Sequence, residues 1–214
     1  MNIYVVFYSE GGHIYKLAQA IAEGARSVDG AKVKLFQTEW LRASEKPASD
    51  KSEAWGRSFA LVPFISAWEL SGADAVVFGT PAKFGMMAAP MRHLLDQLGP
   101  LWADGALLGK VGSVFTSTTT RHGGQESTVT SFHVTLLHLG MIIVGVPYSE
   151  NRLLPIRAFS GLNPYGASTI AGSGQESIPN ENELGIARFQ GQHVAEITRS
   201  LVLGRARSKR SSLR

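Results

Sequence analysis

The sequence contains no cysteine, so disulfide bonds, thiolate metal sites, iron–sulfur clusters and a cysteine nucleophile are all excluded. It has no apolar run near the roughly 18 to 20 residues that span a bilayer, and its first residues already form a strand-like segment. These absences suit a reducing compartment, so we expect a cytoplasmic protein with no membrane span. With 214 residues, of which 44% are hydrophobic, the chain suffices for one globular domain with a sizeable core.

Acidic residues are missing from the last eleven positions, where Arg205, Arg207, Lys209, Arg210 and Arg214 supply five positive charges. The net charge of the whole chain is +4, so residues 1–203 carry a net charge of −1. A basic terminus can bind nucleic acid or an anionic membrane, but this one has neither interleaved aromatic residues nor an apolar face. We therefore expect residues 1–203 to form a single domain, residues 204–214 to be a disordered basic tail, and nucleic acid not to be a partner.

Apolar runs alternate with segments long enough for helices, which is the order of a parallel α/β protein. The runs expected to be strands are Ile3 to Tyr8, Lys32 to Phe36, Ala75 to Gly79, Val111 to Thr116 and Met141 to Val146. Helices are expected to begin near His13, Met87, Gln125 and Glu181. Residues 40–68 are rich in Ser, Lys, Glu and Ala, so we expect an irregular excursion there. The predicted fold class is α/β, a doubly wound five-stranded parallel sheet with helices on both faces.

The segment SEGGHI, residues 9–14, joins the first expected strand to a helix that has apolar Ile14, Leu17 and Ile21 on one face. A hydroxyl, two glycines and the free N–H groups at a helix start suit one phosphate group. The segment is not a Walker A motif, because Gly-Lys-Ser/Thr is absent, and it lacks the G-x-G-x-x-G dinucleotide pattern. Taken alone, it fits an ordinary strand-to-helix turn equally well.

In a doubly wound sheet, ligands bind beyond the carboxyl ends of the strands, where the strand order reverses. The segments TPAKFG and TSTTTRHGGQE follow the third and fourth expected strands. The first offers a conformationally fixed proline, a cation and an aromatic ring, and the second adds hydroxyls and glycines. Each composition is common in structural loops. Three such loops at neighbouring strand ends nevertheless favour a ligand site.

Longer motifs connect these loops. The stretch GTPAKFGMMAAPMRHLLDQLGPLWADGALLGKVGSVFTST is followed by HGGQE, TLLHLGMIIVGVPY, NPYGASTIAG and ELGIARFQGQHVA. From Asn2 to about Leu201, the chain resembles the WrbA-type NAD(P)H:quinone oxidoreductases, which include bacterial p-benzoquinone reductases. The resemblance implies a flavodoxin-like fold, non-covalent FMN, NADH or NADPH as electron donor, a quinone as substrate, and a homotetramer built as a dimer of dimers. It also implies two-electron transfer in a ping-pong scheme, for which no metal is needed.

The same resemblance assigns contacts residue by residue. It implies that the FMN phosphate meets Ser9, Gly11, Gly12, His13 and Ile14, that the isoalloxazine edge meets Pro81, Ala82, Lys83 and Phe84, and that the ribityl chain and ring meet Ser117, Thr118, Thr119, Thr120, Arg121 and His122. Trp102 matches the family's aromatic residue at the quinone position. His138 matches a histidine that reaches the flavin pocket, where it would polarise an acceptor oxygen or relay a proton. Without the resemblance, a core tryptophan and a helix-end histidine are the simpler interpretations.

Several positions depart from the family pattern. Gly11 stands where a tyrosine is common, Lys83 replaces an arginine, Met86 replaces an asparagine, and Arg121 is an additional cation. A lysine keeps the charge of an arginine but loses its bidentate geometry. These departures bear on the choice between NADH and NADPH more than on FMN binding. Two other functions remain open: a one-electron flavodoxin shuttle, although such carriers are usually strongly acidic, and a non-catalytic flavin-binding regulatory protein.

Overall fold

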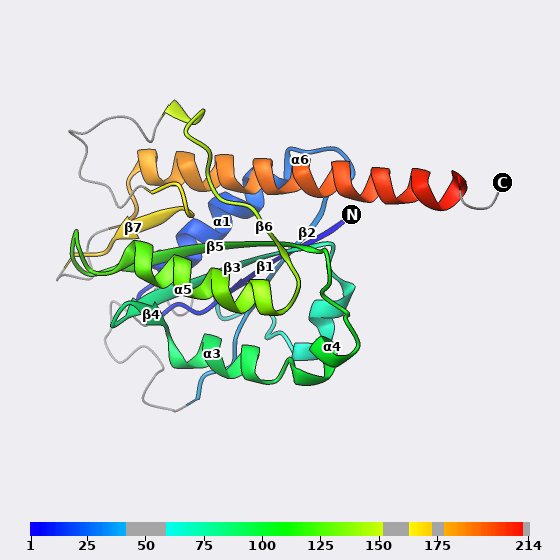
Figure 1. Cartoon of the computed structure of the whole chain (residues 1–214). Helices are drawn as coiled ribbons and strands as arrows, with labels where there is room; N and C mark the ends of the chain where they lie inside the picture. The colour runs from blue at the N-terminus through cyan, green and yellow to red at the C-terminus, as the bar shows by residue number, and fades with distance from the viewer. Residues whose placement is uncertain (42–58, 152–162, 173–177, 212–214) are drawn as a thin grey trace.

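The computed structural model describes residues 1–41, 59–151, 163–172 and 178–211. A parallel sheet lies between two layers of helices (Figure 1). The strands along it are β2 (Lys32–Gln37), β1 (Asn2–Phe7), β3 (Ala75–Lys83), β5 (Val111–Thr118) and β6 (Ile142–Ile143), in that spatial order. The short strand β4 (Met86–Met87) pairs with β3, and β7 (Ser168–Ile170) pairs with β5. The strand order reverses between β1 and β3, so the predicted doubly wound α/β fold is confirmed.

The fifth strand position is shared by two short strands. β6 pairs with the start of β5 at Val111↔Ile142, and β7 pairs with its end at Thr116↔Ser168. The expected strand from Met141 to Val146 is therefore only partly found. The chain leaves the ladder after Ile143, and a later segment of the sequence supplies the other half.

One face of the sheet is covered by α1 (His13–Arg26) and α6 (Glu181–Ser211), which lie side by side in Figure 1. Glycines let the two helices approach to backbone contact. A Cβ atom on Gly24 would lie 1.8 Å from the Arg188 carbonyl oxygen, and one on Gly191 would lie 2.0 Å from the Ile21 carbonyl oxygen. No side chain fits at either position, so this crossing fixes α1 against the last helix of the chain.

The opposite face carries α3 (Ala89–Asp96), α4 (Gly99–Ala103) and α5 (Gln125–His138), together with the 3-10 helix η2 (Ala67–Gly72). The rings of Phe78 and Phe132 stack at 5.2 Å between the sheet and α5. The helix expected near Met87 begins at Ala89, because the two preceding residues pair as β4 with the end of β3. The other three helices begin at the expected positions.

The expected irregular excursion, residues 40–68, lies partly outside the described residues, which omit 42–58. Its described aromatic residues have different environments. The Trp40 ring packs against Tyr8 at 5.3 Å, and Phe59 is buried against Phe7. Trp68, on η2, is 61% exposed. The excursion thus contributes to the core as well as to the surface.

The C-terminal helix α6 continues to Ser211, whereas residues 204–214 were expected to be a disordered tail. Alanine, arginine, lysine and leucine favour helix, and the Arg205 guanidinium donates a hydrogen bond to the Gly109 carbonyl oxygen. Figure 1 shows the last turns extending beyond the sheet. Residues 212–214 lie outside the described chain. Across the described part of the chain, no helix combines the length and apolar character needed to cross a membrane.

Candidate functional site

The first candidate loop follows β1 and leads into α1. Tyr8 donates its N–H to the Gly79 carbonyl oxygen at 2.9 Å, and the chain then turns toward His13. Ser9 is 2% exposed, and its Oγ accepts a hydrogen bond from the Gly12 N–H at 3.1 Å. Gly12 has φ 83°, a left-handed value that glycine adopts without strain. These features fix a tight turn directly before the helix.

The donors at this turn suit an anion. The first N–H groups of a helix have no partner within it, and the helix dipole adds positive potential at the same end. No acidic residue occupies the first turn of α1. Among the described residues, the Ser9 hydroxyl accepts a hydrogen bond but donates none, so its proton is available to a phosphate oxygen. The buried hydroxyl and the helix start therefore fit one phosphate group, such as that of FMN.

The second loop is a β-hairpin. The expected strand was to end at Gly79, but β3 continues to Lys83 and turns back into β4. Phe84 and Gly85 form the turn with φ values of 53° and 77°, the left-handed geometry of a tight hairpin. At the base of the hairpin, the Thr80 Oγ1 accepts a hydrogen bond from the Ala88 N–H at 2.9 Å. The segment is thus a backbone edge that is braced by the Thr80 side chain.

The third loop connects β5 to α5 and folds around one carbonyl group. The Thr120 oxygen accepts hydrogen bonds from Thr118 Oγ1 at 2.8 Å, the Gly123 N–H at 3.1 Å and Gln125 Nε2 at 3.3 Å. Gly124, with φ 93°, is the N-cap of α5. The loop therefore leaves a second helix N-terminus close to the same end of the sheet.

The three loops meet at the carboxyl ends of their strands. Lys83 Nζ lies 2.8 Å from Glu10 Oε2, which joins the hairpin to the first loop. Glu10 Oε1 also accepts a hydrogen bond from the Tyr8 hydroxyl at 3.4 Å. A Cβ on Gly124 would lie 3.1 Å from the Cα of Gly85, so the third loop packs directly on the hairpin. The ion pair is half-exposed and contributes at most about 1 kcal/mol, so it acts mainly by holding the two loops together.

The structure brings most of the expected FMN residues to this one surface, which we call the three-loop site. They differ in exposure. Ser9, Gly12, Ile14, Ser117 and Thr118 are buried, Gly11, His13, Pro81 and Ala82 are half-buried, and Lys83, Phe84, Thr119, Thr120, Arg121 and His122 are exposed.

Trp102 and His138 are not part of the three-loop site of the same chain. Trp102 lies on α4, before β5 begins, and is 63% exposed, so it is not a core tryptophan. His138 is the last residue of α5 and is exposed. Just beyond it, the Gly140 carbonyl oxygen accepts a hydrogen bond from the Gly109 N–H at 2.7 Å, at the start of β5. Both residues therefore lie toward the amino ends of the strands, opposite the three loops.

Two features at the three-loop site were not expected from the sequence. One is Glu10, because nothing in the sequence indicates that it pairs with a residue 73 positions later. The other is β7 beside the end of β5, where the Asn163 amide donates to Ser168 Oγ at 3.0 Å and both residues are buried. The β-branched pair Thr169 and Ile170 is a weak signal for a strand there, because a run of two such residues is short.

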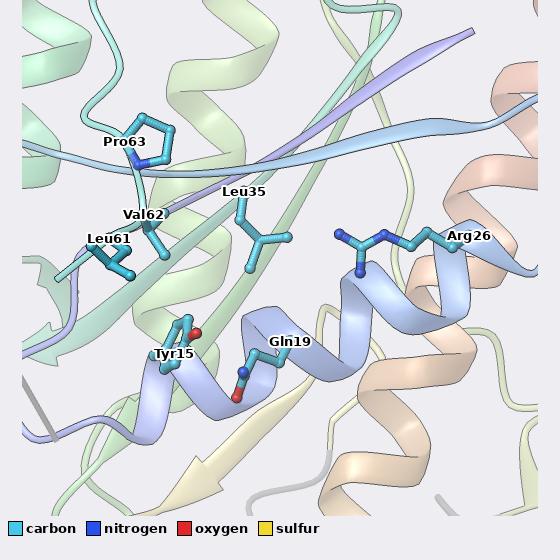
Figure 2. A pocket seen from close by; sticks show the side chains of 7 residues that line it. All are labelled: Tyr15, Gln19, Arg26, Leu35, Leu61, Val62 and Pro63. Atoms are coloured by element: carbon cyan, nitrogen blue, oxygen red, sulfur yellow. The ribbon is translucent and has the colours of Figure 1, made fainter. Parts of the chain in front are cut away.

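A separate hollow of about 430 Å³ lies between α1, β2 and residues 61–63 (Figure 2). Its lining residues are Tyr15, Gln19, Arg26, Leu35, Leu61, Val62 and Pro63. None of the residues expected to hold FMN lines this hollow. The three-loop site and the hollow are thus different places on the molecule.

Comparison with known proteins identifies the family of the chain. The profile of a family described as NADPH-dependent FMN reductase matches residues 1–150. An NAD(P)H dehydrogenase (quinone) of Aromatoleum aromaticum is 52% identical over 206 residues, which cover 96% of this chain and 100% of the relative. A protein of the same name from Trichlorobacter lovleyi is 55% identical over 200 residues, which cover 94% and 98% of the two chains.

Solved structures share the architecture. A WrbA-like flavodoxin from Agrobacterium tumefaciens aligns with a TM-score of 0.60 at 22% identity, covering 93% of this chain and 98% of that one. An archaeal flavodoxin aligns with a TM-score of 0.59 at 18% identity, covering 93% and 99%. At these identities the likeness shows a flavodoxin-like fold alone.

Proposed function

The chain belongs to the NADPH-dependent FMN reductase family, and from this premise we propose that it is an FMN-dependent NAD(P)H:quinone oxidoreductase. The observation that carries the proposal is the meeting of three loops where the strand order reverses, together with a buried Ser9 hydroxyl at a helix start that donates no hydrogen bond to any described residue. Full-length relatives at 52% and 55% identity, named NAD(P)H dehydrogenase (quinone), support the reaction class. The proposed donor is NADH or NADPH and the proposed acceptor a p-benzoquinone-type quinone, in the cytoplasm.

FMN, when bound, supplies the hydride chemistry that links a nicotinamide donor to a quinone acceptor. Ser9 and the N–H groups of residues 11–14 would hold its phosphate. The hairpin backbone from Pro81 to Phe84 would border the flat ring, and residues 117–122 would contact the ribityl chain and the ring. In a ping-pong scheme, donor and acceptor would use the exposed side of the bound ring in turn. The chain's own contribution is to orient the reactants rather than to supply an acid or a base at the three loops.

Anaerobic stopped-flow spectroscopy of the FMN-loaded protein tests this function. Stoichiometric bleaching of the flavin by NADH or NADPH, followed by rapid reoxidation by benzoquinone, is the expected result. Accumulation of a stable one-electron state would instead indicate a flavodoxin-type shuttle. Purified protein that neither contains nor binds FMN would overturn the proposal in favour of a non-flavin role.

We propose that the protein assembles as a homotetramer, a dimer of dimers. Exposed apolar side chains gather on α4, α5 and the segment between α4 and β5, at Trp102, Leu108, Val134 and Leu137. Leu108 packs on Gly140, so the patch continues from α4 to the end of α5, where His138 lies. Large exposed apolar patches usually mark interfaces. In such an assembly, Trp102 and His138 of one subunit would complete the three-loop site of another.

The tetramer is the expected species in multi-angle light scattering of the FMN-loaded protein at micromolar concentration, with dimers on dilution. A dimer of dimers has two kinds of subunit contact, and loss of the weaker one on dilution would turn the tetramer into dimers. Replacing Leu137 by glutamate should shift the population toward smaller species, because it buries a charge in the apolar patch. A wild-type protein that stays monomeric with FMN bound would contradict the assembly and remove Trp102 and His138 from the proposed site.

Replacing Trp102 by alanine should raise the KM for benzoquinone by about threefold to tenfold, because a lost aromatic contact contributes about 0.5 to 1.5 kcal/mol beyond its buried area. FMN affinity should change little, because the proposed FMN contacts lie on the three loops, and the fold of each subunit should be kept, because the side chain is largely exposed within its own chain. Trp68→Ala is the matched control, because Trp68 is 61% exposed on η2. Equal quinone kinetics in the wild type and Trp102→Ala would exclude this role.

A further inference from the structure

The final turns of α6, residues 199–211, extend beyond the body of the protein, and we call them the basic projection. Among the residues of α6 whose burial the structure describes, 181–208, the last buried one is Thr198. Leu201 and Val202 are half-buried, and every residue from 203 to 208 is exposed. In Figure 1, the end of α6 points away from the three-loop end of the sheet. Packing against the sheet and α1 therefore stabilises the first part of α6 but not its outer turns.

The charge of the basic projection is unfavourable for an isolated helix. Glu196 is the last acidic residue of the chain; it lies one turn before Arg199, but no acid lies within a turn of Arg205 and Arg207 along the helix. These outer turns continue a helix that is already nucleated, but they gain little from packing, because the described side chains from Leu203 to Ser208 are exposed.

The base of the projection adds to this positive charge. The Arg205 guanidinium bonds to the carbonyl oxygen of Gly109, and the neighbouring Lys110 is a second cation. Burial lowers the pKa of Lys110, and Arg205 lowers it further, whereas Asp74 raises it. Cations thus gather at the point where the helix leaves the body. A cluster of cations of this kind favours the binding of an extended anionic surface.

We infer that the basic projection docks on an anionic lipid surface. Juxtaposed lysines and arginines on a helix bind anionic headgroups electrostatically. The segment from Thr198 to the end of the sequence has no aromatic residue on which bases could stack, so a single-stranded nucleic acid is the less suitable polyanion. Leu203, 54% exposed among these cations, suits the boundary of a bilayer.

Binding to a lipid surface would also bring the proposed quinone substrate close to the protein. This step rests on the proposed function, since quinones with apolar substituents partition into membranes. A protein held at the bilayer by α6 encounters such acceptors more often than a freely diffusing one. The body of the chain remains outside the bilayer, because the contact is made by charge at one helix end.

Co-sedimentation of the FMN-loaded full chain with vesicles tests this inference. Phosphatidylcholine vesicles containing phosphatidylglycerol should bind the protein, pure phosphatidylcholine vesicles should not, and added salt should release it. The double variant Arg199→Gln, Arg207→Gln should bind roughly thirtyfold more weakly, at about fivefold for each cation removed near the surface. Glutamine preserves helix propensity, which circular dichroism checks.

A matched control removes the same charge elsewhere. Arg26→Gln with Arg92→Gln changes two exposed arginines on α1 and α3 and should bind vesicles like the wild type. Equal loss in the control, equal binding to uncharged vesicles, or tighter binding to duplex DNA than to anionic vesicles would overturn the inference. Benzoquinone reduction in vesicle-free solution is measured separately. A variant series that binds vesicles as expected but reduces no quinone would contradict the proposed function and leave the lipid contact standing.

Discussion

Replacing Ser9 by alanine should weaken FMN binding by about tenfold to a hundredfold, because a hydrogen bond to a charged group contributes about 1.5 to 3 kcal/mol. The variant also removes the oxygen that accepts the Gly12 N–H, so the turn before α1 loses its own bracing. Both effects weaken the proposed phosphate site, and neither changes the exposed side of the ring where donor and acceptor would bind. Fluorescence titration of the apoprotein with FMN measures the change.

Ser27→Ala is the control for this prediction. Ser27 follows the last turn of the same helix, and its Oγ donates to the Gly24 carbonyl oxygen at 2.7 Å. The chemical change is identical, but it lies at the end of α1 away from the proposed phosphate. FMN affinity should therefore match that of the wild type. A Ser9→Ala protein that binds FMN as tightly as the Ser27→Ala protein would remove the first loop from the FMN site.

The other large effect concerns the fold. Gly24→Ala should lower the free energy of unfolding by more than about 3 kcal/mol, at or beyond the upper end of ordinary overpacking, because its Cβ would overlap backbone rather than a movable side chain. The helices α1 and α6 must separate to admit the methyl group, which opens the core beneath them. Urea unfolding of the FMN-free protein followed by circular dichroism measures the loss.

Gly204→Ala provides a control of opposite sign within α6. A Cβ at Gly204 would meet no atom within 4 Å, so the substitution costs no space. Alanine in a helix is more favourable than glycine by roughly 0.5 to 1 kcal/mol, and the variant should be slightly more stable than the wild type. Similar unfolding midpoints for the two alanine variants would show that the α1–α6 crossing is looser than described.

The sequence was sufficient for the parts of the fold in which local pattern and tertiary packing agree. The apolar run from Ile3 leads through two glycines into a helix with apolar spacing, and β1 and α1 lie where this pattern predicts them. The fifth strand position was harder, because β7 contains Ser168 and Thr169, whose polar side chains carry no strong apolar signal. Its place beside β5 depends on a partner about 50 residues earlier, which no local pattern encodes.

In the candidate site, too, features set by local sequence could be predicted, and features set by contacts between distant segments could not. Ser9 and Gly12 could be predicted from the physical requirements of a phosphate at a helix start. Lys83 could be singled out, but its pairing with Glu10 could not, because that contact exists only after three strands have been placed. Trp102 and His138 were chosen through a family resemblance. Within one chain, these two residues lie far from the three loops, because they are near the amino ends of the strands. Sequence composition does not reveal at which end of the sheet a residue lies.

The contact between α1 and α6 has a consequence for synthesis on the ribosome. The first helix of the chain is made early, but the residues that cover its buried face, such as Ile186, Ala187 and Val194, are made near the end. Until they emerge, the apolar face of α1 is open to solvent and to chaperones, and the helix start beside Ser9 is not fixed. Domains fold as units once their sequence is available. If FMN binds at the three loops as proposed, we expect its uptake to follow translation of nearly the whole chain rather than to accompany it.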